Sequence, residues 1–160
     1  MALQRINRVM IRDVRSWRGE HEFTFDEDIT VLYGPNGSGK SSLWIGIVLG
    51  LLFKISSSIS TEIRSIGGGS RNPYVEVDFT ANGIQYRIEK TFGIRSIAAA
   101  RLLNLDSGEL LCEQDAAVIE CRNLLTGSGD QEILGKNPGD VAKALEVSTK
   151  GQIVDLILPK

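Results

Sequence analysis

The sequence predicts an α/β fold in which a glycine-rich loop joins a strand to a helix, with an antiparallel β-sheet wing beside them. Three observations lead to this prediction. The segment Gly34–Ser42 separates an apolar, β-branched run from a long apolar run. Two later stretches, 74–90 and 98–112, alternate polar and apolar residues around short turns that contain glycine. The 160 residues suffice for one domain with a hydrophobic core.

Composition excludes several other classes of protein. The net charge is −2 and 42% of the residues are hydrophobic, which is ordinary for a globular domain. Cys112 and Cys121 form no C-x-x-C pair and His21 is the only histidine, so neither a zinc site nor a disulfide framework is expected. There is no secretory signal, and the run Leu43–Phe53 is too short to cross a bilayer. We therefore expect reduced thiols, a cytoplasmic location and no membrane partner.

The first 33 residues contain three apolar stretches, which we interpret as three strands. Residues 3–16 show both a helical spacing of apolar residues and the β-like cluster Val9–Ile11, but no helix cap, which favours a strand. The expected elements are a strand within 3–16, a turn at Trp17–Glu20, a half-buried strand at His21–Phe25, a turn at Asp26–Asp28 and a buried strand at Ile29–Tyr33.

Gly34–Ser42 fits the phosphate-binding template of a glycine, four variable residues and Gly-Lys-Ser. Glycines leave room for phosphate oxygens to approach the backbone, and the loop N–H groups lie at the positive end of the following helix. Lys40 would reach the β- and γ-phosphates of a nucleotide, and the Ser41 hydroxyl would bind Mg²⁺. The apolar residues after the loop predict a buried helix from Gly39 to Lys54.

The remainder of the chain predicts loops, two hairpins and further helices. The expected elements are a polar loop at Ser56–Arg71, a hairpin at Tyr74–Lys90 with its turn at Ala81–Gly83, a hairpin at Ala98–Cys112 with its turn at Asp106–Gly108, a helix at Asp115–Leu125, a loop at Gly135–Gly139, a helix at Asp140–Leu145 and an apolar segment at Gln152–Leu158. The apolar face of the helix at Asp115–Leu125 is expected to contain Ala116, Ile119 and Leu124, with Cys121 on or near it.

Positive charge gathers at the N-terminus, where residues 1–18 hold one acidic residue and five arginines: Arg5, Arg8, Arg12, Arg15 and Arg18. Such an edge could contact nucleic acid or nucleotide phosphates. A solvated surface without a partner explains the same charges equally well.

Hydrolysis needs more than a phosphate loop, because an acidic residue must hold Mg²⁺ and another group must position the attacking water. The nearest matches to an acid after an apolar strand are Leu102–Asp106, Val75–Asp78 and Ile153–Asp155, and each is interrupted, short or better interpreted as part of a hairpin. There is no guanine-recognising Asn-Lys-x-Asp motif and no Leu-Ser-Gly-Gly-Gln transporter signature. The residues therefore predict nucleotide binding without a complete hydrolytic site.

The span Ile11–Leu43 resembles the opening of the SMC-like ATPases, which include the structural-maintenance-of-chromosomes proteins, the SbcC-type repair ATPases and the RecF and RecN relatives. The long loop carries the resemblance, and the turn Asp13–Trp17 stands where the group has Asn-Phe-Arg-Ser-Phe, with Asp13 and Val14 as departures. The resemblance implies a phosphate-loop NTPase half-domain, residues 1–160 being the N-terminal lobe of an ABC-type ATPase head from a longer coiled-coil protein. It implies ATP and Mg²⁺ as cofactors, and a role in DNA repair, chromosome maintenance or defence.

The same resemblance implies the site residues. Those at the nucleotide are Arg15, Ser16, Asn36, Gly37, Ser38, Gly39, Lys40, Ser41 and Ser42, with Ser41 also on Mg²⁺. Gln152 is the candidate for the catalytic glutamine that contacts Mg²⁺, although Lys150–Gln152 lacks the Gln-Gly order of the group. Gln85 lies closer to the loop in sequence, but it falls within a predicted strand.

In such ATPases two heads enclose ATP, and a C-terminal half supplies the signature and the acidic strand. The resemblance therefore implies a C-terminal lobe on the same or a partner chain, a second head, and DNA as partners. ATP hydrolysis is expected only when these complete the site. Two other functions stay open: a small phosphate-loop kinase with Arg64 and Arg71 on a lid, and a non-catalytic module that senses nucleotide.

Overall fold

The computed structural model describes residues 3–25, 29–54, 63–64, 72–93 and 99–126. In chain order the elements are β1 (Leu3–Val14), β2 (Trp17–Thr24), α1 (Lys40–Leu52), β3 (Tyr74–Ala81), β4 (Ile84–Thr91), β5 (Ala99–Asn104), β6 (Glu109–Glu113) and α3 (Gln114–Thr126). The predicted helix after the loop, both hairpins and the helix near 115–125 are confirmed. The predictions made for 56–62, 65–71, 135–139, 140–145 and 152–158 lie outside the described residues.

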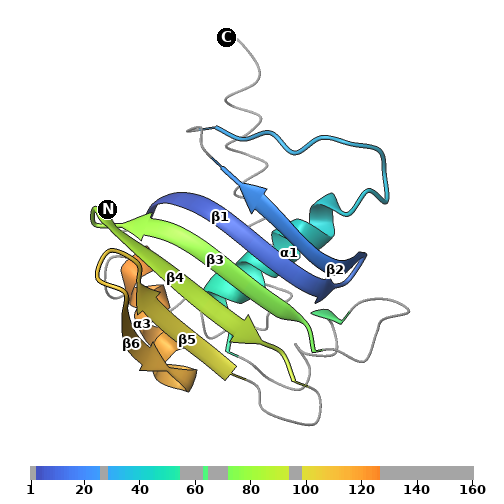
Figure 1. Ribbon diagram of the computed structural model, residues 1–160. Helices are drawn as coiled ribbons and strands as arrows, with labels where there is room; N and C mark the ends of the chain where they lie inside the picture. Colours follow the sequence, from blue (N-terminus) through green and yellow to red (C-terminus); the bar gives the residue numbers. More distant parts are fainter. Residues whose placement is uncertain (1–2, 26–28, 55–62, 65–71, 94–98, 127–160) are drawn as a thin grey trace. The chain divides into compact units, whose positions relative to one another are not determined.

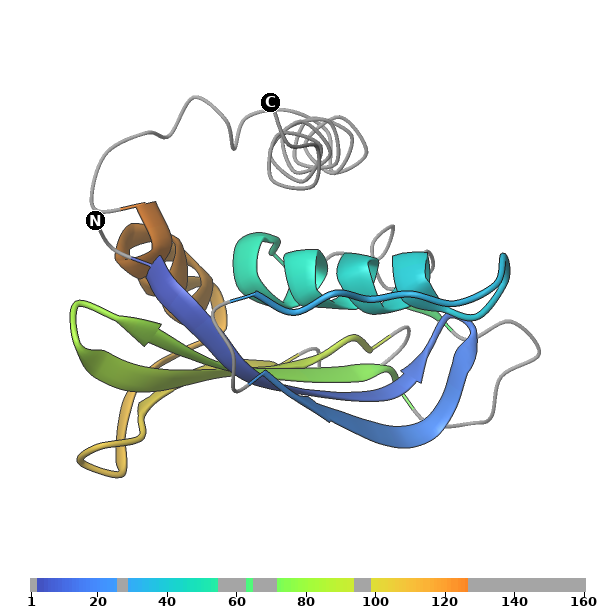
Figure 2. The same ribbon diagram turned by 90° about the horizontal axis from the view of Figure 1, so that it is seen from above.

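The strands form one six-stranded antiparallel sheet in the order β2-β1-β3-β4-β5-β6 (Figure 1). α1 and α3 lie on the same face of this sheet (Figure 2). β1 pairs with β2 on one side and with β3 on the other, so the predicted wing is continuous with the N-terminal hairpin. This is the α/β fold with an antiparallel wing that the sequence predicts.

The core lies between this sheet and α1. Every second residue of β3 faces the helix, so Val75, Val77 and Phe79 are fully buried. Val9 and Ile11 lie opposite Val77 and Val75 in the β1–β3 register and are buried with them. The period of two in the sequence therefore indicates correctly which face of these strands is covered.

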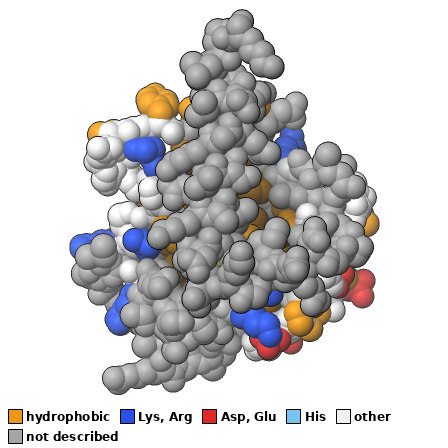
Figure 3. All heavy atoms as spheres, turned by 180° about the vertical axis from the view of Figure 1, so that it is seen from behind, with side chains coloured by type: hydrophobic (Ala, Val, Ile, Leu, Met, Phe, Trp, Pro, Cys, Tyr) orange, Lys and Arg blue, Asp and Glu red, His pale blue; other side chains and the backbone are white. Residues whose placement is uncertain are grey.

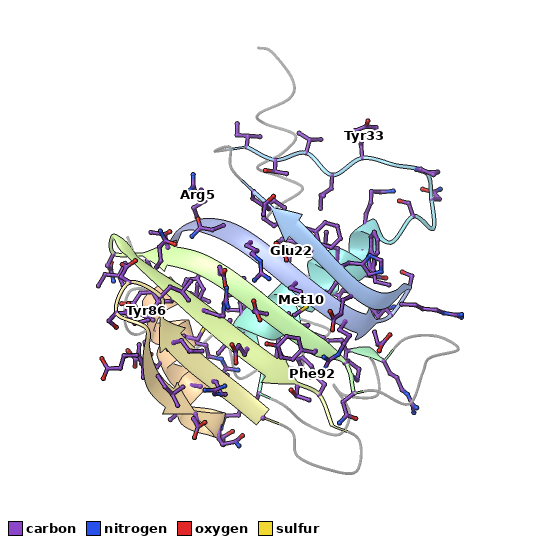
Figure 4. The ribbon with its side chains drawn as sticks, viewed as in Figure 1. Arg5, Met10, Glu22, Tyr33, Tyr86 and Phe92 are labelled. Carbon is purple, nitrogen blue, oxygen red and sulfur yellow. The ribbon has the colours of Figure 1, made fainter. Side chains whose placement is uncertain are left out.

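One predicted strand is wrong. Residues 29–33 pair with no strand among the residues described, and Ile29, Val31 and Tyr33 are 67%, 69% and 92% exposed. Figure 4 shows the Tyr33 side chain projecting away from the sheet. A β-branched apolar run forms a strand only where a neighbouring strand satisfies its backbone N–H and C=O groups. The described part of the chain supplies no such neighbour here.

The first turn lies earlier in the chain than predicted. β2 begins at Trp17, so the predicted turn Trp17–Glu20 belongs to a strand, and residues 15–16 connect β1 to β2. Asp13 has a positive φ of 53°, a conformation that Asp tolerates better than most residues. Its carboxylate accepts a hydrogen bond from the Gly19 N–H at 2.8 Å. This bond stabilises the tight connection between the two strands.

The buried face of α3 also differs from the prediction. Ala117, Val118 and Cys121 are buried. Of the predicted residues, Ala116 and Ile119 are exposed and Leu124 is half-buried, whereas Cys121, predicted on or near the same face, is buried as expected. Both sets follow the spacing of a helical face, because the two faces are neighbours on a helix of 3.6 residues per turn. Periodicity alone does not decide between them in a short helix.

Two glycines of α1 face the sheet at different distances, which leads to a stability prediction. A Cβ at Gly50 would lie 2.7 Å from Val75 Cγ1, whereas one at Gly46 would lie 3.5 Å from Ile11 Cγ2. Gly50→Ala is expected to lower the free energy of unfolding, since overpacking costs about 1–3 kcal/mol and the helix gains about 0.5–1 kcal/mol. Gly46→Ala is the matched control and should be as stable as the wild type or more so. Urea denaturation measures both, and equal midpoints for the two variants would contradict the close packing at Gly50.

Candidate functional site

The loop 34–39 leads from the extended segment 29–33 directly into α1. Gly37 and Gly39 have positive φ values of 83° and 93°, which would strain any residue with a side chain. Among the described residues no side chain caps the N-terminus of α1, and the first turn of this helix contains no acidic residue. The first N–H groups and the positive end of the helix dipole are therefore available to an anion.

The Lys40 side chain folds back over this loop. Its Nζ donates to the carbonyl oxygens of Gly34 at 2.7 Å and Pro35 at 2.8 Å, and to Ser38 Oγ at 3.2 Å. The Ser38 N–H donates to the Pro35 carbonyl oxygen at 3.2 Å, which closes the loop around the ammonium group. A positive charge beside exposed backbone N–H groups is suited to bind a phosphate.

The two serines after Lys40 have different surroundings. Ser41 is exposed, so its hydroxyl is accessible to a metal ion. Ser42 is buried, and its Oγ forms a 2.7 Å hydrogen bond with Ser16 Oγ. Ser41 thus stays the predicted Mg²⁺ ligand, while Ser42 connects α1 to the β1–β2 turn.

The β1–β2 turn and Trp17, the first residue of β2, lie beside the loop. Trp17 Nε1 donates a hydrogen bond to the Gly39 carbonyl oxygen at 3.0 Å, although the two residues are 22 positions apart in sequence. The Arg15 N–H donates to the Ile63 carbonyl oxygen at 2.9 Å, which fixes the other side of the turn. The turn and the loop therefore form one connected structure at the start of α1.

The residues predicted at the nucleotide lie on these two pieces of chain. Those in the loop and first helical turn are Asn36, Gly37, Ser38, Gly39, Lys40, Ser41 and Ser42, and those in the β1–β2 turn are Arg15 and Ser16. Asn36 and Ser38 are exposed, and Arg15 is half-buried. Gln152 lies outside the described residues, so its role as the catalytic glutamine stays a prediction.

Two of the three candidate magnesium acids have structural partners. Asp78 lies on β3, and its two oxygens accept hydrogen bonds from Arg87 at 2.6 Å and 2.8 Å. Asp106 lies in the β5–β6 turn and accepts a hydrogen bond from the Gln85 N–H at 3.2 Å. Asp155 lies outside the described residues. The described part of the chain thus holds Asp78 and Asp106 within the wing, and Gln85 is placed there with them.

Two of the N-terminal arginines have ion pairs across the open face of the sheet. Arg8 pairs with Glu22 at 3.0 Å and with Glu76, and Arg12 lies 3.6 Å from Glu20. The hydrogen bond between Arg8 and Glu22 raises the pKa of Arg8 and lowers the pKa of Glu22. Figure 3 shows the opposite face, where Lys and Arg side chains of the described residues are visible at several places around the edge. For Arg8 and Arg12 these contacts favour the interpretation as a balanced, solvated surface.

Sequence reasoning missed two residues that the structure brings into contact with α1. Trp17 follows Arg15 and Ser16 in the segment Asp13–Trp17, which carries the family resemblance. This position in the sequence was the signal that could have indicated a role for Trp17 at the site. Lys90 is fully buried, and its Nζ donates to two carbonyl oxygens at the C-terminal end of α1. The alternation of β4 places Lys90 on the same face as buried Ile88, which is unusual for a lysine.

Within the described residues, no helix is long and apolar enough to cross a membrane. The same residues contain no group of three or more His, Cys, Asp and Glu side chains that could hold a metal ion. Cys112 and Cys121 are free thiols.

Residues 8–126 match the family described as AAA domain. The DNA double-strand break repair Rad50 ATPase of Sulfolobus acidocaldarius is 32% identical over 114 residues, which cover 69% of this chain and 13% of that protein. The Rad50 ATPase of Methanopyrus kandleri is 39% identical over 88 residues, covering 54% of this chain and 10% of that protein. Structural maintenance of chromosomes protein 1 of Arabidopsis thaliana is 29% identical over 167 residues, covering 89% of this chain and 13% of that protein. The chain thus spans a small part of the length of these relatives.

One solved structure with a similar fold comes from work on the structural biochemistry of ATP-driven dimerization and DNA stimulated activation of SMC ATPases. The TM-score is 0.52, the sequences are 18% identical, and the match covers 94% of this chain and 98% of that chain. At this identity the similarity concerns the fold, and it agrees with the mixed α/β architecture described above.

Proposed function

This chain belongs to the AAA domain family, as the N-terminal lobe of an SMC-like ATPase head, and we propose that residues 1–160 bind ATP and Mg²⁺ as one half of an ATPase site. The observation that carries this function is the exposed phosphate loop at the uncapped start of α1, with Lys40 Nζ within hydrogen-bond distance of three loop acceptors. Backbone N–H groups and an ammonium group converge on the same place. The β- and γ-phosphates of ATP fit this arrangement.

Within the site, Lys40 binds the phosphates and Ser41 supplies its hydroxyl to Mg²⁺. Arg15 and Ser16 approach the phosphates from the β1–β2 turn. Gln152 is the glutamine that contacts Mg²⁺ and orients the attacking water, an assignment that rests on the sequence resemblance. When bound, Mg²⁺ neutralises the charge that develops on the phosphates during hydrolysis.

A C-terminal lobe completes the site, on this chain or on a partner chain. The segment 29–33 precedes the phosphate loop, pairs with no strand of the described residues and exposes apolar side chains, of which Val31 and Tyr33 are the most exposed. An unpaired extended segment accepts another strand readily, since pairing satisfies its N–H and C=O groups and covers its apolar residues. The lobe that adds this strand also supplies the acidic residue for Mg²⁺.

The names of the relatives suggest the other partners. Rad50 of Sulfolobus acidocaldarius is described as an ATPase of DNA double-strand break repair, and the work behind the solved structure concerns ATP-driven dimerization and DNA-stimulated activation. By analogy, ATP joins two heads of this protein in the cytoplasm, DNA is bound by the whole protein, and hydrolysis separates the heads. The cellular role is then DNA repair, chromosome maintenance or defence.

ATPase activity tests this function. We expect the 160-residue chain alone to hydrolyse essentially no ATP, and the complete head, meaning this chain with its C-terminal lobe, to hydrolyse ATP when DNA is present. Steady turnover by the chain alone would contradict the proposal. Transfer of the γ-phosphate to an acceptor molecule would favour the kinase, and ATP binding without turnover by the complete head would favour the nucleotide-sensing module.

Association of the two lobes, expressed as separate chains, tests the role of 29–33. Val31→Asp is expected to weaken their association by about tenfold or more, because the new carboxylate would be desolvated between paired strands. Val31 is 69% exposed, so the substitution leaves the fold of this lobe intact. Leu110→Asp on β6, where Leu110 is 39% exposed, is the matched control. Equal affinities of the two variants in titration calorimetry would exclude 29–33 as the contact between lobes.

A further inference from the structure

We propose that Trp17 is a positioning residue for the phosphate site, because its indole N–H orients the peptide group between Gly39 and Lys40. The inference rests on the proposed function, since it assumes that the loop binds the phosphates of a nucleotide. It assigns a role to a residue outside the phosphate-loop motif. Trp17 belongs to β2 and reaches the loop through the fold of the protein.

The Gly39 carbonyl oxygen accepts two hydrogen bonds. One comes from the Leu43 N–H at 2.9 Å, the first bond of α1, and the other from Trp17 Nε1 at 3.0 Å. A trans peptide group is planar, so its C=O and the following N–H point in opposite directions. Holding the Gly39 C=O toward the helix and the indole therefore aims the Lys40 N–H toward the concave side of the loop, where an anion binds.

The tryptophan ring also fills the space beside Gly39. A Cβ on Gly39 would lie 2.7 Å from Trp17 Nε1 and 2.8 Å from Trp17 Cε2. The glycine, with its φ of 93°, therefore permits both the conformation of the loop and the close approach of the ring. The indole ring thus packs directly against Gly39, the last residue of the loop.

The ring is fixed by its own strand. Trp17 makes edge-to-face contacts with His21 at 4.9 Å and with Phe23 at 5.3 Å between ring centroids. The neighbouring Ser16 holds Ser42 through a 2.7 Å hydrogen bond, which provides a second attachment of the turn to α1. Since strand β2 supplies these contacts, the donor to Gly39 is already in place before any ligand arrives. A site that is oriented in advance loses less entropy when it binds its ligand.

Trp17 contacts the backbone of the phosphate loop, so loss of its N–H donor should weaken binding of the phosphates and leave binding of the nucleotide base unchanged. Trp17→Phe keeps an aromatic ring against His21 and Phe23 but removes the N–H donor. We expect this variant of the complete head to bind ATP about three- to tenfold more weakly, the effect of one hydrogen bond. We expect inorganic tripolyphosphate, which has no base, to lose affinity by the same factor. Trp44→Phe, the change at the other tryptophan of this chain, is the matched control and should leave both affinities unchanged.

Fluorescence of Trp17 gives a second readout that needs no change at position 17. In a complete head in which all other tryptophans, including Trp44, are phenylalanine, the emission of Trp17 should change as ATP is added. The titration should give the same dissociation constant as calorimetry.

Thermal unfolding shows whether Trp17→Phe is folded at the temperature of the titration. A folded variant with weaker binding separates positioning from loss of the fold.

The outcomes distinguish this inference from the proposed function. If the wild-type head fails to bind ATP, the proposed function is wrong. If it binds ATP and Trp17→Phe binds ATP and tripolyphosphate as tightly as the wild type, the positioning role is wrong and the proposed function stands. A loss for ATP alone would mean that Trp17 contacts the base, and this result also overturns the inference.

Discussion

Lys40→Ala should weaken binding of ATP and Mg²⁺ to the complete head by about a hundredfold or more. The Lys40 ammonium is the charged donor of the loop, and a hydrogen bond to a charged group contributes about 1.5–3 kcal/mol. Loss of contacts to two phosphates therefore costs about 3 kcal/mol or more, which corresponds to a factor of over about 100 in the dissociation constant. Isothermal titration calorimetry with ATP and Mg²⁺ measures this directly.

The same substitution should leave the fold intact. Among the described residues, Lys40 Nζ donates to loop atoms of Gly34, Pro35 and Ser38, all of which are exposed and can be hydrated when the ammonium is removed. Lys54→Ala is the matched control, because Lys54 lies just beyond the other end of α1 and forms a surface ion pair with Asp115 at 3.1 Å. We expect Lys54→Ala to bind ATP normally. Unchanged ATP affinity in Lys40→Ala would show that the loop is not part of the nucleotide site.

The elements that the sequence predicts correctly are those specified by neighbours in the chain. The β3–β4 hairpin alternates polar and apolar residues on both sides of Asn82-Gly83, and the register observed pairs Ala81 with Ile84 across that turn. The glycine loop and the apolar run after it likewise specify α1. In these cases the local pattern contains all the information that the element requires.

The features that sequence reasoning missed depend on contacts between distant residues. Segment 29–33 has the composition of a buried strand, but pairing is decided by another strand, and the described residues offer none. Trp17 is visible only as an aromatic residue near a turn until the fold brings it to Gly39. Gln152 lies outside the described residues, so its role stays a prediction from the sequence. The candidate site was therefore predictable as a motif, and its supporting contacts were not.

Lys90 is the second residue whose role emerges only from the fold. It is fully buried, and its Nζ donates to the carbonyl oxygens of Leu49 at 3.1 Å and Phe53 at 2.7 Å. Arg122 on α3 donates to the Leu52 carbonyl oxygen. The last carbonyl groups of a helix have no partner within the helix, and basic groups favour that negative end. Lys90 and Arg122 thus attach the C-terminal end of α1 to β4 and α3.

Lys90→Ala is expected to lower the free energy of unfolding by about 3–5 kcal/mol. The change opens a cavity beside α1 and leaves two buried carbonyl oxygens without their donor. Urea denaturation measures the loss, with Lys54→Ala as the control, since the Lys54 side chain is 48% exposed and should change stability by less than about 1 kcal/mol. A loss of similar size in both variants would show that the contacts of Lys90 with α1 contribute little.

The stability of the wild type should also rise with pH, and Lys90 is the cause. Burial lowers the pKa of Lys90 from 10.5 to about 7, so between these values the unfolded chain holds a proton that the folded chain has released. Stability then increases with pH, by up to about 1.4 kcal/mol per unit for one proton. Burial also raises the pKa of Cys121 from 9.0 to about 12. This shift lowers the stability as the pH rises, but only above about pH 9, where the thiol of the unfolded chain loses its proton. Urea denaturation at pH 7, 8 and 9 should therefore show a rise in the wild type and in Lys54→Ala that Lys90→Ala lacks, and an equal slope in all three proteins would assign the rise to other groups.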